Sequence, residues 1–283
     1  DIETDDKNIT SLRSGSSFFR IHGIEADEFP SLPKIGEERS ITLSQSKIRS
    51  MLNKTSFAIS KDESQQAMNG VLISLRDHKM RVVATDGARL VLIDEEVDVP
   101  PQCQGEFIVP SRAVHELNHR LSDKGTVDFI FSESLASLTL KDELGGSVVL
   151  LTRLIEDNYP DYRVVIHPEG KKRIDLPREK FLQALRRAEI MTGYEQHSAR
   201  LEFTNNMLSI TSHLPDVGEA RETMPINYNG EDITIALNPS YFIEALNALS
   251  EEEVFIELRD EESPCVLKSE GFLCVVMPMS VRW

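Results

Sequence analysis

The feature that most constrains the fold of this chain is an internal repeat with a period near 130 residues. Residues 41–43 and 47–52 (Ile-Thr-Leu, then Lys-Ile-Arg-Ser-Met-Leu) correspond to residues 174–176 and 180–185. In each copy a short apolar strand precedes apolar residues at i, i+3 and i+4, the spacing of an amphipathic helix. A period of this length indicates a duplicated domain, because solenoid repeats are only about 20–50 residues long.

Each copy contains a second helix and several strands. Ile108-Val109-Pro110-Ser111 leads into one helical pattern, and Leu237-Asn238-Pro239-Ser240 leads into its counterpart 129 residues later. Between the helices apolar and polar residues alternate, as in 135–140, and turn residues such as Asn205-Asn206 separate the alternating segments. The sequence therefore predicts an α+β fold, with two helices packed on mostly antiparallel sheets in each copy.

The N-terminal segment resembles the end of a copy. Residues 18–21 and 28–30 resemble residues 148–151 and 158–160, again at an offset of 130. We therefore expect residues 1–38 to be the C-terminal remnant of a first domain. Residues 39–168 and 169–283 would form the second and third domains.

Bulk properties favour a globular protein of the cytoplasm. No apolar run approaches the roughly 20 residues that span a bilayer, and no signal-peptide pattern stands at the start. The three cysteines lack metal-type spacing and fit a reducing compartment. We expect no cofactor. The formal net charge of −16 argues at first against nucleic-acid binding, although net charge does not say where the charges lie.

Four short motifs carry a family resemblance. They are Ala84-Thr85-Asp86-Gly87, Tyr159-Pro160-Asp161-Tyr162-Arg163, Asn238-Pro239-Ser240-Tyr241 and Val275-Val276-Met277-Pro278-Met279. With them the chain, from Arg13 to Met279, resembles the bacterial DNA polymerase III beta subunit, the sliding clamp. The resemblance implies three like-folded domains per subunit, most of the first being absent here, and a non-enzymatic ring around duplex DNA that gives the replicative polymerase its processivity.

The resemblance also implies a cleft between the second and third domains that binds short peptides of client proteins. The expected cleft residues are Met68, Thr85, Gly87, Arg89, Leu90, Pro160, Val165, Asn238, Tyr241, Val275, Val276, Met277, Pro278 and Met279. Methionines provide adaptable apolar surfaces, whereas Arg89, Asn238 and Tyr241 offer polar groups around an apolar floor. On pattern alone, Leu90, Val275 and Val276 also fit an ordinary strand core. Ala88, Val164 and Gln196 depart from the commonest family pattern and leave the peptide preference open.

Positive charge is concentrated on the predicted helices, which line the hole of the ring in the family. The expected DNA-facing residues are Lys47, Arg49, Lys54, Arg112, Arg120, Lys180, Arg186 and Arg187. Loose contacts to phosphates would hold DNA without sequence preference, as sliding requires. A solvated helix face is the alternative for any single helix. The helix predicted at 239–249 does not fit, because Glu244 is its only charged residue.

The resemblance further implies protein partners. These are the catalytic subunit of the replicative DNA polymerase, the clamp loader, and other replication and repair proteins with clamp-binding peptides. A homodimer is expected when the first domain is complete. Its interface would contain Phe19 and Ile21 from the first domain and Ile190 and Met191 from the third.

One catalytic pattern is present and keeps a rival interpretation open. His115-Glu116-Leu117-Asn118-His119 matches His-Glu-x-x-His, the pattern of zinc metalloproteases. No third ligand is evident in the next turn of the sequence, and we expect no metal site and no catalytic residue. A clamp-like paralogue that is not loaded on DNA is the other alternative.

Overall fold

The computed structural model describes residues 1–29, 31, 33, 35–36, 39–166, 172–193 and 197–280. The chain forms two compact units, Asp1–Ile35 and Gly36–Trp283. The domain boundaries expected after residues 38 and 168 lie outside the described residues, so this division stays a prediction.

The first unit is a three-stranded antiparallel meander. It contains β1 (Ile2–Thr4), β2 (Ile9–Ser14) and β3 (Ser17–His22), in the sheet order β1-β2-β3, followed by a short 3-10 helix at Ala26–Glu28. Every residue of β3 is exposed in this unit.

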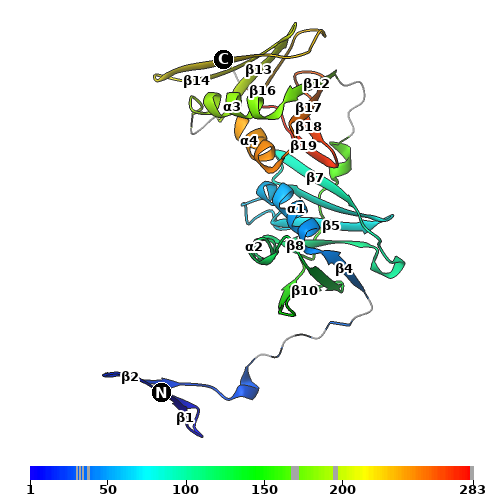
Figure 1. The fold of residues 1–283 in the computed structure, drawn as a ribbon. Coiled ribbons are helices and arrows are strands. Elements are labelled where there is room, and N and C mark those ends of the chain that lie inside the picture. The colour runs from blue at the N-terminus through cyan, green and yellow to red at the C-terminus, as the bar shows by residue number, and fades with distance from the viewer. Residues whose placement is uncertain are drawn as a thin grey trace. The chain divides into compact units, whose positions relative to one another are not determined.

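In its described residues, the second unit contains four α-helices and three antiparallel sheets (Figure 1). The helices are α1 (Gln45–Thr55), α2 (Ser111–Arg120), α3 (Arg178–Glu189) and α4 (Pro239–Ala248). The strands of an eight-stranded sheet are, in sheet order, β12 (Lys172–Pro177), β17 (Glu253–Leu258), β18 (Cys265–Ser269), β19 (Phe272–Val276), β7 (Arg89–Glu96), β6 (Lys79–Thr85), β5 (Gly70–Arg76) and β8 (Gly105–Pro110).

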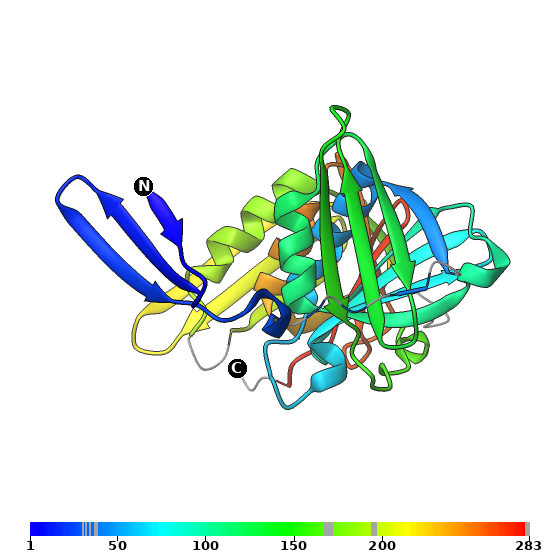
Figure 2. The same ribbon diagram turned by 90° about the horizontal axis from the view of Figure 1, so that it is seen from below.

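Two four-stranded sheets complete this unit. One has the order β11 (Ser147–Arg153), β10 (Leu135–Lys141), β9 (Thr126–Phe131) and β4 (Ser40–Ser44). The other has the order β15 (Gly218–Pro225), β14 (Met207–Leu214), β13 (Ala199–Thr204) and β16 (Ile233–Leu237). Figure 2 shows β9, β10 and β11 of the first of these sheets, in green, beside α2.

The strand orders repeat between the two copies, which confirms the predicted fold class. The order β7-β6-β5-β8 in the second repeat matches β15-β14-β13-β16 in the third. The first strand of each copy likewise pairs with a late strand, β4 with β9 and β12 with β17. The helices expected around 47–52 and 180–185, after Pro110-Ser111 and at 239–249 are all present.

The eight-stranded sheet joins the two repeats. β19, the last strand of the third repeat, pairs antiparallel with β7 of the second, so that Val275 lies opposite Leu90 and Val276 opposite Arg89. Because both strands are rich in buried apolar residues, this junction has the character of a domain core.

The two faces of this sheet are covered differently. Alternate residues such as Val91 and Val276 point into a core shared with the helices, which follow one another in the order α3, α4, α1, α2 (Figure 1). Leu90 and Val275 point to the opposite face, where they pack with Tyr162 and Ile166. Among the described residues, no helix is long and apolar enough to cross a membrane.

Candidate functional site

A tight turn between β6 and β7 forms one wall of the candidate site. The Thr85 hydroxyl donates to the carbonyl oxygen of Arg89 over 2.6 Å and accepts from the Gly87 amide over 3.1 Å. The Asp86 carboxylate accepts from the amides of Ala88 and Arg89 at 3.1 and 3.0 Å. Gly87 has φ +88°, and a Cβ there would meet nothing within 4 Å. Glycine is therefore favoured here by the left-handed backbone, and the space above it is open.

A cavity of about 160 Å³ lies beside this turn at the junction of the two repeats. Nine of the expected cleft residues line it: Met68, Thr85, Gly87, Arg89, Leu90, Pro160, Val165, Val275 and Met277. Leu90 and Val275, which face each other in the β7–β19 pair, form part of its wall. Met277 is 38% exposed, so its thioether is available to a ligand.

Five of the expected residues do not line this cavity: Asn238, Tyr241, Val276, Pro278 and Met279. Strand alternation turns Val276 toward the helices, where it is fully buried. The Asn238 side chain accepts from the Ser240 amide over 3.0 Å and caps α4. Met279 is fixed through its backbone, because its amide donates to the carbonyl oxygen of Ala236 over 2.8 Å.

Two residues that the sequence interpretation left out, Asp161 and Tyr162, line the cavity. Both belong to the segment Tyr159–Arg163, which was singled out as a motif although only Pro160 was assigned to the site. Tyr162 begins a 3-10 helix and is 4% exposed. Its ring packs with Leu90 and Val275 on the sheet face opposite the helices and so supports the cavity wall. The motif itself was the signal that could have identified them.

Arg89 lies in the cavity wall, but its guanidinium is directed into the protein. Its Nε donates to Asp86 Oδ2 over 3.1 Å and its Nη2 to the Phe57 carbonyl oxygen over 2.6 Å, while Nη1 forms an ion pair with Glu244. The side chain also lies over the Tyr241 ring, 4.6 Å from its centroid. The sequence indicated a polar group for a ligand, whereas these donors already have partners within the chain.

Two of the three departures from the family pattern, Ala88 and Val164, do not line the cavity. Ala88 contributes its carbonyl oxygen, which accepts from the Met277 amide over 2.9 Å, and any residue could make this bond. Val164 is 76% exposed and does not line the cavity. Gln196 lies outside the described residues.

The basic residues expected to face DNA differ in their partners. Arg49 pairs with Asp123 at 2.7 Å, Lys54 with Glu251 at 3.7 Å, Arg187 with Glu222 at 2.7 Å, and Arg120 with Glu116. Lys47 and Arg186 make hydrogen bonds to the Glu96 carbonyl oxygen and the Asn247 side chain. Within the described part of the chain, Arg112 and Lys180 are exposed and have no such partner. Local acids thus compensate more of the helix charge than the helix sequences indicated.

The His-Glu-x-x-His pattern does not form a metal-binding cluster. His115 and His119 lie on an exposed face of α2 with their Nε2 atoms 3.1 Å apart, and Glu116 is paired with Arg120. No group of three His, Cys, Asp or Glu side chains suited to a metal occurs among the described residues.

The three cysteines are free and buried. Burial raises the pKa of the Cys274 thiol to about 12, so this thiol stays protonated.

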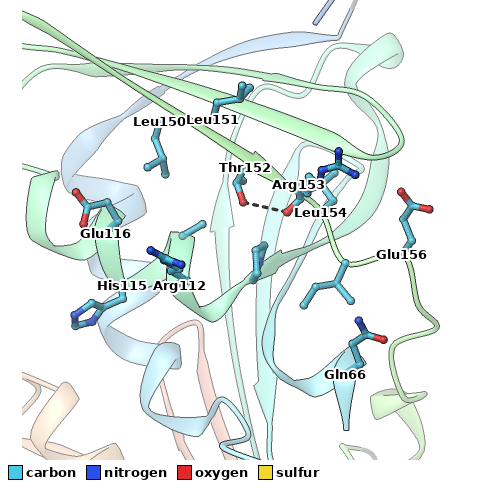
Figure 3. Close-up of a pocket in the computed structure, with 13 residues that line it drawn as sticks. Gln66, Arg112, His115, Glu116, Leu150, Leu151, Thr152, Arg153, Leu154 and Glu156 are labelled. Carbon is cyan, nitrogen blue, oxygen red and sulfur yellow. Dashed lines mark hydrogen bonds between the residues drawn. The ribbon is translucent and has the colours of Figure 1, made fainter. Parts of the chain in front are cut away.

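A larger cavity of about 870 Å³ lies between α2 and β11 (Figure 3). Arg112, His115 and Glu116 come from α2, and residues 150–154 come from β11 and its end. Arg112 and His115 stand 129 residues before Tyr241 and Glu244, the two residues of α4 that contact Arg89. The same two positions on the helix therefore face a cavity in one repeat and a neighbouring side chain in the other.

Two copies of one α+β repeat, joined by a shared sheet and with a mostly apolar cavity at the junction, define a protein built from repeated domains. Residues 42–161 match the family model of the DNA polymerase III beta subunit, central domain, and residues 163–280 match that of its C-terminal domain. The beta sliding clamp of Chlamydia pneumoniae is 32% identical over 275 residues, which cover 97% of this chain and 74% of that protein. For Chlamydia trachomatis the identity is 33%, and the chain spans 65% of the relative's length.

Solved structures show the same likeness. The DNA polymerase sliding clamp of Pseudomonas aeruginosa, with ligand, is 27% identical with a TM-score of 0.89, over 99% of this chain and 76% of that one. A Bartonella birtlesii sliding clamp bound to griselimycin is 29% identical with a TM-score of 0.87, over 98% and 75%. The chain belongs to the DNA polymerase III beta subunit family of sliding clamps. The comparisons give no support to a metalloprotease or to an unloaded paralogue.

Proposed function

We propose that this protein acts as a processivity clamp, a non-enzymatic ring component that encircles duplex DNA and binds client peptides in the cavity between its second and third repeats. The observation that carries this proposal is the cavity itself. Nine of the residues that the family resemblance assigned to the cleft converge on it from both repeats.

The chemistry of the cavity suits an apolar peptide anchor. Met68, Leu90, Val275 and Met277 supply its apolar surface, and the two methionines can adapt to different side chains. Burying one large apolar side chain contributes about 1.5–3 kcal/mol. A short peptide with two such anchors could therefore bind measurably while remaining exchangeable among clients.

The test is fluorescence anisotropy with a labelled peptide that contains the clamp-binding segment of a replicative polymerase. Met277→Ala should weaken binding at least about tenfold, or 1.4 kcal/mol. Met207→Ala is the matched control, because Met207 is also 38% exposed but lies on β14, away from the cavity. The proposal fails if the folded wild type does not bind the peptide or if the two variants bind equally well.

We propose that α1, α2 and α3 face the DNA. Support comes first from their order along one face of the sheet. Arg112 and Lys180 are exposed and unpaired in the described structure. The other six cations are at least partly exposed, and four of them form ion pairs with acids. Exposed ion pairs are worth only about 0–1 kcal/mol, so phosphates could displace the acids from the paired cations.

We also propose the domain division 1–38, 39–168 and 169–283, with a homodimeric ring when the first domain is complete. Two observations support it. β11 is the counterpart of β19, yet it is an edge strand with Val148 and Val149 exposed at 42% and 59%. Phe19, Ile21 and Ile190 are exposed at 61%, 51% and 71%, and Met191 is partly exposed, as expected for residues that a partner subunit covers.

The partners proposed on this basis are duplex DNA, the catalytic subunit of the replicative polymerase, the clamp loader, and other replication and repair proteins with clamp-binding peptides. A cytoplasmic location is proposed with them. In this role the client protein carries any polymerase activity, while the clamp encircles the DNA and provides the docking cavity.

A further inference from the structure

We propose that the ion pair between Arg89 and Glu244 is the positioning contact that fixes the geometry of the cavity, by holding the β6–β7 turn of the second repeat against α4 of the third. This inference rests on the proposed function of the cavity as a peptide site. Arg89 would act on the peptide through the position of the turn.

The surroundings of Arg89 favour positioning over ligand contact. The residue is 7% exposed, and each of its three guanidinium nitrogens is directed to an oxygen of the chain. The guanidinium also contacts two aromatic rings, 4.6 Å from the centroid of Tyr241 and 5.4 Å from that of Phe57. The Arg89 guanidinium is planar and permanently charged, and these contacts leave it little freedom to reorient toward a peptide.

Only part of this cluster crosses the junction between the repeats. Asp86 and Phe57 belong to the second repeat, as Arg89 does, whereas Glu244 and Tyr241 belong to α4 of the third. Glu244 is therefore the one charged group of the cluster that ties the turn to the other repeat. Because the Arg89 side chain is only 8% exposed, loss of the Glu244 carboxylate would leave a buried cation with Asp86 as its single counter-charge.

This role also accounts for the anomaly of α4. Glu244 is the only charged residue of that helix and did not fit a basic helix that faces DNA. Its carboxylate is turned to Arg89. The equivalent position of α2 holds His115, which lines the cavity of Figure 3. The acid is thus specific to the repeat that receives Arg89.

The turn and the cavity wall are mechanically connected. The Ala88 carbonyl oxygen, one residue before Arg89, accepts from the Met277 amide over 2.9 Å, and Met277 lines the cavity. Thr85, Gly87 and Leu90, from the same turn and strand as Ala88, line the cavity as well. If the Arg89–Glu244 contact is lost, we expect the turn to move relative to Met277, and the two walls of the cavity to lose their fixed spacing.

The test combines peptide anisotropy with hydrogen exchange at the Met277 amide. Glu244→Ala should weaken peptide binding about five- to tenfold and speed exchange at Met277 at least tenfold. Glu244→Gln, which keeps the side-chain length and an acceptor oxygen, should recover part of both effects. Lys268→Gln is the matched control, because it breaks the ion pair Lys268–Glu257 at 2.8 Å, which lies in the same sheet as Arg89 but within one repeat, and should change neither readout.

A double-mutant cycle distinguishes positioning from direct contact. If Glu244 acts through Arg89, Glu244→Gln should have no further effect on affinity in an Arg89→Gln background. Equal losses in both backgrounds, or wild-type affinity and exchange in Glu244→Ala, would overturn the inference. If the wild type binds no peptide, the proposed function fails instead. Exchange at Met277 then decides whether the ion pair positions the turn, and unchanged exchange in Glu244→Ala again overturns the inference.

Discussion

The carboxylate of Asp94 lies between two cations of the neighbouring strand. Arg81 donates to it through Nε and Nη2 at 2.6 and 2.7 Å, and Lys79 approaches Oδ2 at 3.2 Å. Burial raises the pKa of Asp94, but the hydrogen bonds and charge of Arg81, with those of Lys79, outweigh burial, so the net pKa lies below the ordinary value. The pair links β6 to β7 close to the junction of the repeats.

The depressed pKa predicts a dependence of stability on pH. The Asp94 contribution is fully present above the ordinary aspartate pKa near 3.9 and is lost as pH falls through the lower pKa of the folded state. Asp94→Asn should lower the free energy of unfolding at pH 7 by about 2 kcal/mol, because it removes a charge-assisted bidentate hydrogen bond. Urea unfolding of both proteins at pH 7 and near pH 3 checks this. A difference that did not shrink at the lower pH would contradict it.

At the scale of the elements, helices α4 and α1 begin in different ways. α4 begins at Pro239, whose missing amide donor costs nothing in a first helical turn, after Asn238 with a side chain that caps the Ser240 amide. α1 begins after Ser44, which has extended backbone angles but makes no side-chain cap bond, since its hydroxyl faces that of Ser46 at 2.8 Å. Residues of good capping type therefore contribute differently in the two helices.

This difference is testable with two matched substitutions. Asn238→Ala should lower the free energy of unfolding by about 1 kcal/mol, because it leaves the Ser240 amide without its acceptor. Ser44→Ala should cost clearly less, and Asn238→Asp should restore most of the stability. Chemical denaturation followed by far-UV circular dichroism measures all three. Equal losses for Asn238→Ala and Ser44→Ala would show that the observed cap bond does not contribute.

At the scale of the whole molecule, the shared sheet couples the two repeats. Five residues of β19 pair with five of β7, from Phe272 opposite Ile93 to Val276 opposite Arg89, and one continuous core lies under both repeats. Unfolding one repeat would expose the apolar edge strand of the other and lose this pairing. The coupling therefore predicts that both repeats unfold together.

The measurement is hydrogen exchange in increasing denaturant, followed separately for peptides from β5 and β6 and from β13 and β14. Protected amides of both groups should converge on one global free energy of unfolding. A Val275→Asp substitution, which places a charge in the 1%-exposed junction, should lower that common value by several kcal/mol. Loss of protection in one repeat while the other stays protected would contradict cooperative unfolding.

Much of the fold was predictable because it depends on local pattern and on repetition. The alternation of apolar and polar residues in 135–140 predicted strand β10, and helical spacing after Ile41 and Ile174 predicted α1 and α3. The recurrence of the pattern at one period predicted two like-folded copies. Each strand or helix pattern involves residues only a few positions apart, so it can be recognised without knowledge of any distant contact.

The sequence by itself thus determined the repeat, the elements of each copy and, through the family resemblance, nine of the residues that line the cavity. Only the tertiary structure decided which neighbours share a face. The register of β19 on β7 sends Val275 to the cavity and Val276 to the helices. It also brings Arg89 to Glu244 across 155 residues of sequence. The face to which a side chain points in a paired strand depends on the register of the pairing. An ion pair between repeats depends on how the two repeats pack against each other. Neither can therefore be predicted from a local stretch of the sequence.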